Sequence, residues 1–188
     1  MSQFEFIETT ISGCYLVQPM KRPDDRGYFV KTFHAPEFET ASLETNFTEE
    51  YYSWSHKGMI RGLHFQTPPH EHSKLVYCPI GEVLDVILDL RIGSPMFSKA
   101  VSFTLSETLT NVLYVPAGIA HGFAVQSSNA LMMYKVSSVY SPQNDSGILW
   151  DSVGLDWGIK IPIVSSRDRS FRTFQDFQSS FQYDWSSN

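Results

Sequence analysis

Residues 82–91 read Glu-Val-Leu-Asp-Val-Ile-Leu-Asp-Leu-Arg, and their alternation decides the fold class. Successive side chains of a β-strand point to opposite faces. One face would carry Leu84, Val86, Leu88 and Leu90, and the other Val83, Asp85, Ile87, Asp89 and Arg91. The first face is fully apolar and predicts a core. The second mixes carboxylates with apolar groups, which indicates the wall of a partly lined cavity.

Similar short segments recur along the chain, separated by Gly, Pro, Asn and Ser. Apolar segments bounded by such turn residues predict strands. We expect strands at residues 14–18, 28–33, 59–65, 74–78, 82–90, 99–105, 111–115, 122–125 and 131–139. Helical periodicity is scarce, although residues 36–43 are compatible with a short helix that has Pro36 in its first turn. Many short strands with frequent turns predict an all-β sandwich, jelly roll or barrel.

Length and composition narrow the classes of function. A chain of 188 residues without repeats or linkers predicts one domain over residues 1–188, with residues 171–188 as a C-terminal extension. The formal net charge is −6, whereas nucleic-acid-binding proteins usually carry a basic excess, so we expect no nucleic-acid partner. Cys14 and Cys78 are too few for a disulfide framework, and neither has metal-ligand spacing.

The sequence also carries no targeting signal that we identify. Residues 1–17 lack a basic segment followed by an apolar one, so no signal peptide is expected. No apolar run approaches the roughly 20 residues that span a bilayer. These observations predict a cytoplasmic protein with no membrane partner.

Four ionisable side chains, His64, Lys74, His121 and Tyr134, lie in or beside apolar runs. A polar group there costs free energy unless it has a partner or a function. Together they supply a base, a cation, a second imidazole and a phenol, which is the set that proton transfer beside a carbonyl needs. The ordinary alternatives are a satisfied core histidine for His64 and a solvated lysine for Lys74.

The segment Pro116-x-Gly118-x-x-His121 resembles the second signature of the cupin superfamily, whose members are small jelly-roll barrels. In metal-binding cupins this histidine is a ligand, together with a His-x-His pair and a glutamate. His70-Glu71-His72 offers the pair, but the glutamate expected a few residues later is missing. A metal-dependent oxygenase built on His70, His72 and His121 therefore lacks a ligand, and an exposed polar loop is the other interpretation. We expect no metal and no cofactor.

A longer, ordered set of strings resembles the dTDP-4-dehydrorhamnose 3,5-epimerase family from about residue 13 to residue 169. The strings are Arg61-Gly62-Leu63-His64-Phe65-Gln66, Lys74-Leu75-Val76, Gly81-Glu82-Val83-Leu84-Asp85-Val86, Asp89-Leu90-Arg91-x-Gly93-Ser94-Pro95, Pro116-Ala117-Gly118-Ile119-Ala120-His121-Gly122-Phe123, Tyr134-Lys135, Trp150-Asp151 and Asp156-Trp157. The resemblance implies a cupin-type jelly-roll barrel with short peripheral helices. It implies a cofactor-independent epimerase that inverts C3, C5 or both in a nucleotide-linked 4-keto-6-deoxy sugar, and a homodimer.

The resemblance also implies roles for the ionisable residues. His64 matches the family's base, and Asp168 matches the acidic partner that orients it, although residues 166–169 would otherwise be assigned to the surface. Lys74 matches the cation that stabilises the enolate oxygen. Tyr134 matches the acid that returns a proton to the opposite face. His121 either donates to the enolate or holds the pocket, and Asp85 either orients His121 or pairs with another cation.

Two points of strand geometry remain open at this stage. Tyr134 and Tyr140 are six residues apart and would share one face of a strand, so only the resemblance favours Tyr134 as the acid. Strict alternation would place Arg61 and His64 on opposite faces, whereas the family directs both toward the ligand. A bulge or twist at Gly62 would resolve this conflict.

Nucleotide recognition departs from the family pattern. Arg26 and Phe29 match residues that bind the diphosphate of a neighbouring subunit and pack on the base, and a guanidinium suits phosphate. Lys31 stands where the family usually has glutamate, and Glu49 and Tyr51 stand where it has glutamine and asparagine. The resemblance therefore leaves dTDP, CDP and GDP sugars open. A noncatalytic sugar-binding cupin is the remaining alternative, and it leaves the joint presence of the proton-transfer residues unexplained.

Overall fold

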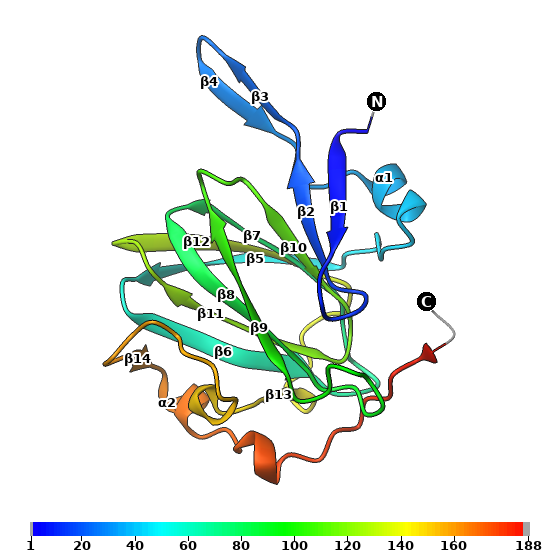
Figure 1. The fold of residues 1–188 in the computed structure, drawn as a ribbon, viewed down its shortest axis with the longest axis vertical. Helices are drawn as coiled ribbons and strands as arrows, with labels where there is room; N and C mark the ends of the chain where they lie inside the picture. The colour runs from blue at the N-terminus through cyan, green and yellow to red at the C-terminus, as the bar shows by residue number, and fades with distance from the viewer. Residues whose placement is uncertain (1, 186–188) are drawn as a thin grey trace.

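The described residues of the computed structural model, 2–185, form two facing β-sheets and a projecting hairpin (Figure 1). The strands are β1 (Phe4–Glu8), β2 (Tyr15–Pro19), β3 (Lys21–Asp24), β4 (Gly27–Val30), β5 (Glu49–His56), β6 (Met59–Gln66), β7 (Lys74–Ile80), β8 (Glu82–Asp89), β9 (Ala100–Ser106), β10 (Val112–Val115), β11 (Ile119–Val125), β12 (Asn129–Val136), β13 (Asp145–Gly147) and β14 (Ile163–Val164). The helices are α1 (Ala35–Thr40), α2 (Ser166–Arg169) and the 3₁₀ turns η1 (Trp150–Ser152) and η2 (Phe174–Asp176). No helix within residues 2–185 is long and apolar enough to cross a membrane.

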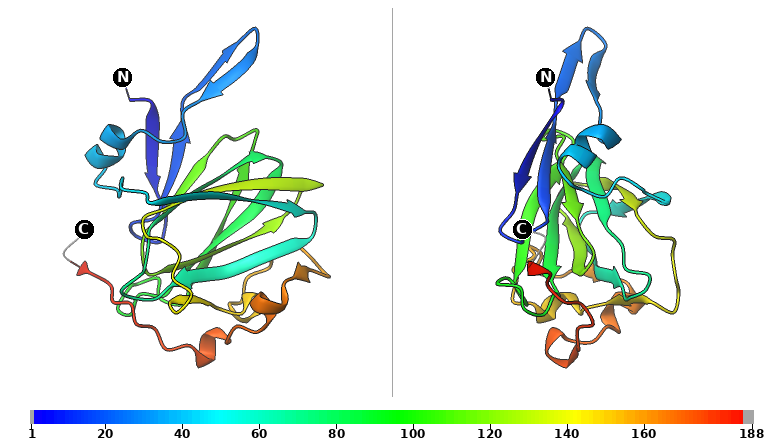
Figure 2. Two further views of the ribbon diagram at one scale, coloured as in Figure 1. Left: turned by 180° about the vertical axis from the view of Figure 1, so that it is seen from behind. Right: turned by 90° about the vertical axis from the view of Figure 1, so that its right-hand side faces the viewer.

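The strand order is that of a jelly roll, and it confirms the all-β prediction. One 6-stranded sheet has the order β1-β2-β10-β7-β12-β5, and the other has the order β13-β6-β11-β8-β9 with β14 beside β6. Neighbours within each sheet are often distant in sequence, as in the antiparallel pairs β2–β10 and β6–β11. The short helices lie at the periphery, in agreement with the cupin-type barrel (Figures 1 and 2).

The alternation along β8 is confirmed by two separate apolar clusters. Val83 and Ile87 belong to the cluster between the two sheets, with members such as Val76, Leu113 and Met132. The other face of β8 packs outside the barrel, in a cluster that contains Val86, Leu88, Leu90, Trp157 and Phe181. Both faces of the strand are thus buried, and Asp85 points to the inner one with Val83 and Ile87.

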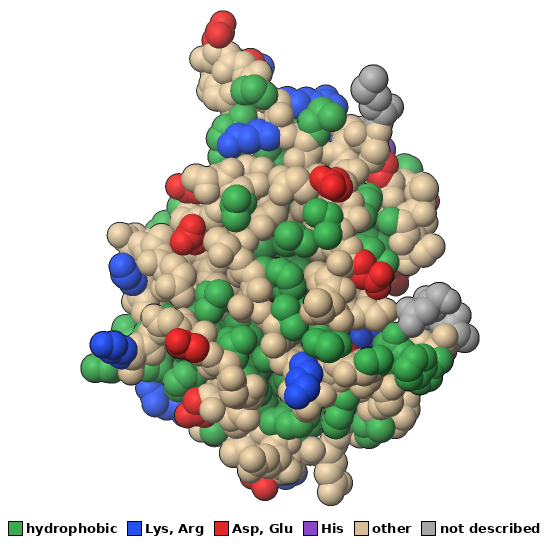
Figure 3. All heavy atoms as spheres, viewed as in Figure 1, with side chains coloured by type: hydrophobic (Ala, Val, Ile, Leu, Met, Phe, Trp, Pro, Cys, Tyr) green, Lys and Arg blue, Asp and Glu red, His purple; other side chains and the backbone are tan. Residues whose placement is uncertain are grey.

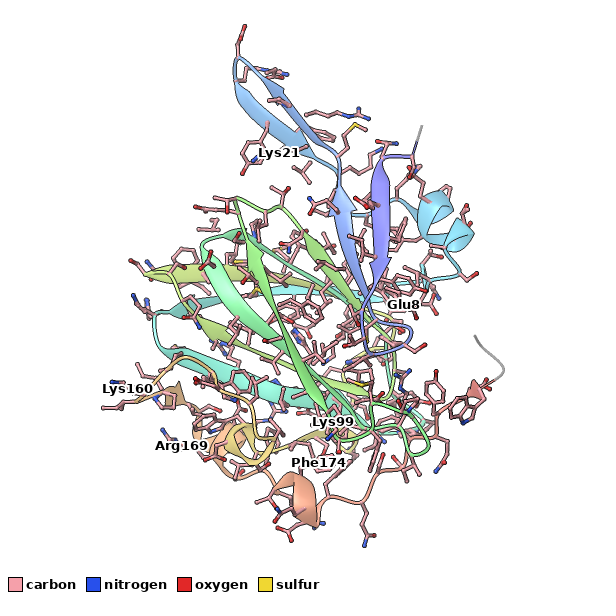
Figure 4. All side chains as sticks on the ribbon, viewed as in Figure 1. Glu8, Lys21, Lys99, Lys160, Arg169 and Phe174 are labelled. Atoms are coloured by element: carbon pink, nitrogen blue, oxygen red, sulfur yellow. The ribbon has the colours of Figure 1, made fainter. Side chains whose placement is uncertain are left out.

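The C-terminal segment covers the outer face of the second sheet (Figure 2). The ring centroids of Phe177 and Phe181 lie 5.4 and 5.8 Å from that of Phe65 on β6. Phe174, labelled in Figure 4, packs on Phe97 with a centroid separation of 5.8 Å. Aromatic burial of this kind attaches the segment to the barrel. Residues 186–188 of the predicted extension lie outside the described range.

The β3–β4 hairpin extends away from the barrel (Figures 1 and 2). All four residues of β3 are exposed, and Tyr28 and Phe29 on β4 are 51% and 56% exposed. Lys21, labelled in Figure 4, places its ammonium 3.8 Å from the centre of the Tyr28 ring. Figure 3 shows acidic, basic and apolar side chains together on this projection.

The predicted segments differ from the observed ones in instructive ways. β1, β3, β5, β13 and β14 lie outside the predicted strands, the helix spans Ala35–Thr40 instead of residues 36–43, and β12 ends at Val136 instead of residue 139. β5 was missed because its sequence, Glu-Glu-Tyr-Tyr-Ser-Trp-Ser-His, has no apolar alternation. Tyr51 and Ser53, two residues apart on β5, line a cavity instead of filling a core. Apolar alternation fails to reveal a strand at a functional surface, because the strand face there carries polar side chains that line a cavity.

Candidate active site

A cavity of about 440 Å³ opens between the two sheets. It brings together six of the residues singled out from the sequence: Tyr51, Arg61, His64, Lys74, His121 and Tyr134. Arg61, His64 and His121 come from β6 and β11 of one sheet, whereas Tyr51, Lys74 and Tyr134 come from β5, β7 and β12 of the other. The two groups therefore form facing walls of a single pocket.

His64 and Asp168 form the expected pair. The distance between His64 Nε2 and Asp168 Oδ1 is 2.9 Å, and the Gly62 N–H donates to Asp168 Oδ2 at 3.1 Å. The α2 turn holds Asp168, because its backbone N–H donates to the Ser165 hydroxyl at 3.0 Å. Asp168 is only 3% exposed, whereas Ser166, Arg167 and Arg169 around it are exposed, so the segment lies at the surface with Asp168 turned inward.

These contacts fix the protonation of the pair. Burial alone would raise the pKa of Asp168, but the hydrogen bonds from His64, Gly62 and Ser165 bring it below its ordinary value. Burial lowers the pKa of His64 and outweighs the opposing effect of Asp168. A carboxylate only accepts hydrogen bonds, so the proton of neutral His64 resides on Nε2 and Nδ1 keeps its lone pair. Nδ1 is thus available as a base.

The prediction about Gly62 is confirmed. His64 pairs with His121 and Arg61 with Phe123, so two residues of β6 stand opposite one residue of β11. Gly62 has a φ of +132°, and a Cβ there would lie 2.6 Å from the Gly122 Cα, so the bulge requires glycine. The bulge turns Arg61 and His64 into the same cavity. Arg61 Nε is held by the Ser55 hydroxyl at 2.9 Å.

Lys74 is a buried cation on the opposite wall, 5% exposed. Its Nζ donates to the main-chain oxygen of His64 at 2.8 Å, so the two catalytic candidates are in direct contact. Burial lowers the pKa of Lys74 to about 8, against the attraction of Asp145 and Asp85. The ammonium is therefore charged near neutral pH and only lightly compensated, which suits the stabilisation of a new negative charge.

His121 and Asp85 form a second buried pair. Nε2 of His121 lies 3.0 and 2.9 Å from the two oxygens of Asp85, and both side chains are almost completely buried. Burial raises the pKa of Asp85, while His121 and Lys74 oppose the shift. Of the two alternatives for Asp85, the structure selects contact with His121. The His121 ring also meets the edge of Tyr134, at a centroid distance of 6.1 Å.

Tyr134 and Tyr140 have different environments, and the expectation that they share a strand face is wrong. β12 ends at Val136, so Tyr140 lies beyond the strand, 59% exposed, with its hydroxyl donating to Asp145 Oδ2 at 3.2 Å. Tyr134 is on the strand and buried, and its ring stacks on Tyr51 at 4.8 Å with an interplanar angle of 17°. Burial raises the pKa of Tyr134, so this phenol stays protonated and is suited to donate.

The nucleotide-binding candidates lie apart from this cavity. Arg26 and Phe29 are exposed on the β3–β4 hairpin, and neither lines the pocket. Arg26 pairs with the neighbouring Asp24, with 2.6 Å between Nη2 and Oδ2. Glu49, at the start of β5, accepts a hydrogen bond from the Tyr140 N–H at 3.1 Å and also lies outside the lining. The described chain therefore does not bring Arg26 to its own His64.

Several lining residues were assigned no role from the sequence: Ser53, Gln66, Asp145 and Arg167. His72, considered there only as a metal ligand, also lines the cavity. Arg167 Nη2 lies 2.5 Å from Asp145 Oδ2, so the two form an ion pair at the pocket. Adjacency to Asp168 is the sequence signal that would have drawn attention to Arg167. Asp145 offers no such signal, because only the pairing of β13 with β6 brings it to the pocket.

The side chains that could bind a metal ion do not come together in the described part of the chain. Within residues 2–185, no group of three or more His, Cys, Asp and Glu side chains could hold a metal ion. His121 is bonded to Asp85, and His72 contacts Gln66 and Ser138. Residues 68–72 form a loop, as the other interpretation expected, with Pro68 and Pro69 exposed, but residues 70–72 are half-buried.

Comparisons with known proteins give a consistent result. The family model described as dTDP-4-dehydrorhamnose 3,5-epimerase matches residues 8–176. A relative of that name from Shigella flexneri is 38% identical over 173 residues, which cover 90% of this chain and 96% of the relative.

Solved structures of similar proteins agree with these sequence matches. The dTDP-6-deoxy-D-glucose-3,5-epimerase of Legionella pneumophila Philadelphia 1, in complex with dTDP-4-keto-L-rhamnose, superimposes with a TM-score of 0.91 and 30% identity, over 96% of this chain and 99% of that one. The dTDP-4-dehydrorhamnose 3,5-epimerase of Bacillus anthracis, with TDP and PPi bound, has a TM-score of 0.88 and 36% identity, over 90% of this chain and 99% of that one.

Proposed function

This chain belongs to the dTDP-4-dehydrorhamnose 3,5-epimerase family, and from that premise we propose how its own residues carry out the reaction. The protein is an isomerase that acts on a nucleotide-linked 4-keto-6-deoxy sugar, with dTDP-4-dehydro-6-deoxyglucose as the substrate. It inverts C3, C5 or both. The observation that carries the assignment is one cavity with His64 on one wall, Tyr134 on the other, and Lys74 in contact with His64.

His64 acts as the base. Its Nδ1 removes the proton from C3 or C5, both of which flank the C4 ketone, and the electron pair moves to O4 to form an enolate. Asp168 keeps Nε2 protonated and stabilises the imidazolium that results. A base with a pKa below 6.5 is unprotonated at neutral pH, which is the state that the first step requires.

Lys74 stabilises the enolate. Its ammonium is buried beside His64 and becomes a partner for the negative charge on O4. His121 lines the facing wall and is held there by Asp85, and we assign this pair to the support of the enolate and of the Tyr134 ring. Electrostatic stabilisation of this kind is effective because Lys74, His121 and Asp85 are almost fully buried.

Tyr134 returns the proton. It projects from the sheet opposite His64, so its hydroxyl reaches the other face of the planar enolate, and addition of its proton there inverts the carbon. The buried phenol is protonated before the step, and Arg61 is a nearby cation that favours the transient phenolate. The reaction as written consumes no oxidant and no reductant, so the protein needs no cofactor for it.

Substrate binding extends the site. We propose that Arg61 contacts the diphosphate, that Glu49 and Tyr51 flank the nucleotide and sugar, and that Arg26 and Phe29 serve the pocket of a second copy in a homodimer. The exposure of the hairpin supports the last assignment. We also propose a cytoplasmic location, in keeping with two free, buried cysteines.

Proton exchange tests the assignment. dTDP-4-dehydro-6-deoxyglucose is incubated with the protein in D₂O and followed by NMR. Enzyme-dependent deuterium at C3 or C5, lost in His64→Ala, is expected, and the labelled carbon identifies the site of inversion. Absence of exchange with folded wild-type protein would reject this substrate, and CDP- and GDP-linked keto sugars would then be compared in the same assay.

A further inference from the structure

His72 lies in the same pocket but has no part in the proton-transfer steps. It precedes β7 by two residues and lines the cavity together with Lys74, whose charge acts on its ring. It belongs to the His-x-His pair that the metal hypothesis singled out, yet no ligand cluster forms around it within the described chain. The ring therefore needs another explanation.

The polar groups around His72 favour one tautomer of its ring. The Ser141 N–H donates to Gln66 Oε1 at 2.7 Å, which orients the Gln66 amide so that its NH₂ faces the histidine. Gln66 Nε2 lies 3.3 Å from His72 Nδ1, donates to the main-chain oxygen of His70 at 2.7 Å, and is 3.2 Å from that of Val139. The Ser138 hydroxyl is 3.3 Å from the same Nδ1 and donates to the His70 oxygen at 2.8 Å. The NH₂ group has no acceptor to offer an Nδ1–H, so its position beside Nδ1 favours the tautomer with the ring proton on Nε2.

The charge state follows from the surroundings. Burial, with a contribution from the Lys74 ammonium, lowers the pKa of His72 to about 3. The ring is neutral at any pH at which the enzyme would work, and it is neither a proton donor in catalysis nor a counter-charge. It is a fixed hydrogen-bond donor through Nε2–H.

Nε2 has no hydrogen-bond partner of its own within residues 2–185. A donor in a half-buried pocket without an acceptor is unfavourable unless water or a ligand supplies one. The pocket wall that carries it also carries Lys74, which the proposed function assigns to the C4 oxygen. A hydrogen-bond acceptor of a substrate bound beside this wall would face two donors, the charged Lys74 ammonium and the neutral His72 Nε2–H.

We propose that His72 is a substrate-contacting residue whose Nε2–H donates to the C4 oxygen of the keto sugar, as the second donor beside Lys74. The inference rests on the proposed function, since it concerns the same substrate and the same oxygen. The hydrogen bond strengthens as the carbonyl becomes an enolate, so His72 contributes mainly to kcat. His72 thereby gains a role that requires no metal ion.

The test compares three variants in the D₂O exchange assay. His72→Leu removes the donor and is expected to lower kcat and the exchange rate at each labelled carbon by roughly 10²-fold, with little change in KM. His72→Gln offers an amide N–H in place of Nε2–H and is expected to recover most of that loss. His70→Leu alters the other histidine of the pair, whose side chain does not line the pocket, and is expected to match wild type.

The outcomes separate the two proposals. Wild-type protein that does not exchange deuterium would overturn the proposed function itself. Wild-type exchange with an unchanged kcat in His72→Leu, or a loss confined to KM, would overturn the role of His72 alone. Equal losses in the Leu and Gln variants would also overturn it, because the amide N–H of the Gln variant should restore the hydrogen bond and most of the activity.

A direct measurement covers the case in which His72→Leu does not fold. Two-bond ¹⁵N–¹H correlation spectra of the wild-type protein at pH 7 report the tautomer of each histidine. We expect neutral His72 with the proton on Nε2, and a shift of that proton when a dTDP-keto sugar binds. An imidazolium, an Nδ1–H tautomer, or no shift on binding would overturn the inference.

Discussion

The facing walls of the barrel and the β3–β4 hairpin both carry residues assigned to the reaction, but they hold them in opposite ways. On the walls, Lys74 and Asp168 are almost fully buried and bonded to His64 or its main chain. On the hairpin, the Arg26 side chain is 89% exposed and its ion pair is with Asp24, two residues away. The walls are organised before substrate arrives, whereas the hairpin is not.

The difference shows which part of the function one chain contains. Buried ionisable groups must be satisfied by neighbours, so their geometry is a property of the fold. Tyr28 and Phe29, both exposed on the projecting hairpin, are large apolar side chains available for contact with another molecule. The proposed proton-transfer residues thus lie within one chain, whereas the proposed contact of Arg26 with the diphosphate calls for a second copy.

The largest expected effect is at the wall that carries the base. His64→Ala removes the group that accepts the substrate proton, so kcat should fall by roughly 10²–10⁴-fold. The rate of deuterium incorporation into the sugar measures the loss. The control is His56→Ala, an exposed histidine that contacts the Asn129 side chain and lies outside the pocket. Retention of wild-type exchange in His64→Ala would remove His64 as the base.

The second-largest loss of activity is expected for substitution of Lys74, on the wall that faces His64. Lys74→Met keeps an unbranched chain but removes the cation beside the enolate, and kcat should fall by roughly 10²–10³-fold. Turnover assays quenched at fixed times give kcat, and a thermal unfolding curve shows whether the variant is folded. Lys99→Met, at an exposed position labelled in Figure 4, serves as the matched control. Loss of the same size in both variants would contradict a specific role for Lys74.

Substitution of Arg26 on the hairpin should have a smaller effect than substitution of His64 or Lys74. It should also weaken substrate binding more than it slows turnover. Arg26→Ala removes charge-assisted hydrogen bonds to the diphosphate, each with a contribution of about 1.5–3 kcal/mol, so kcat/KM should fall roughly 10–100-fold with kcat nearly unchanged. Arg22→Ala, on the same hairpin with its guanidinium donating to Gln3, should leave both parameters near wild type.

Mixing two impaired variants, at subsaturating substrate, sharpens this comparison. A heterodimer of Arg26→Ala and His64→Ala contains one pocket with an intact His64 and an intact Arg26, if the hairpin crosses between copies. Activity should therefore recover to a substantial fraction of wild type when the variants are co-expressed or exchanged. If each hairpin instead served its own pocket, both pockets of the heterodimer would stay defective and no recovery would appear.

The pH profile should give the smallest effect. The pKa of His64 is below 6.5, and protonation removes the base, so kcat/KM should fall as the pH drops through a value below 6.5. The pKa of Lys74 is about 8, and deprotonation removes the cation, so kcat/KM should fall about fourfold between pH 7 and 8.5. Lys74→Arg keeps a cation of much higher pKa and should move the alkaline limb upward. An alkaline limb that stays in place would contradict this assignment.

Much of the fold was predictable because strand alternation reports directly which side chains are buried. The eight residues of β8 alone separated the inner cluster from the outer one. β5 escaped because a strand whose inner face lines a cavity has no apolar period. The end of β12 at Val136 was not predictable from alternation, and this error made Tyr134 and Tyr140 look equivalent.

The sequence by itself determined the all-β class, the family, and the identity of His64, Lys74, His121 and Tyr134 as the residues to examine, because each interrupts an apolar run where a polar group is costly. The family resemblance pointed to Asp168 and Asp85 as partners, but only the tertiary structure established these contacts. Asp168 is 104 residues from His64, and Asp85 is 36 residues from His121. Strand pairing brings such residues together, and no local pattern records which distant strand will be the neighbour. The neutral Nε2–H of His72 likewise depends on Gln66 and Ser141, whose positions the barrel alone sets.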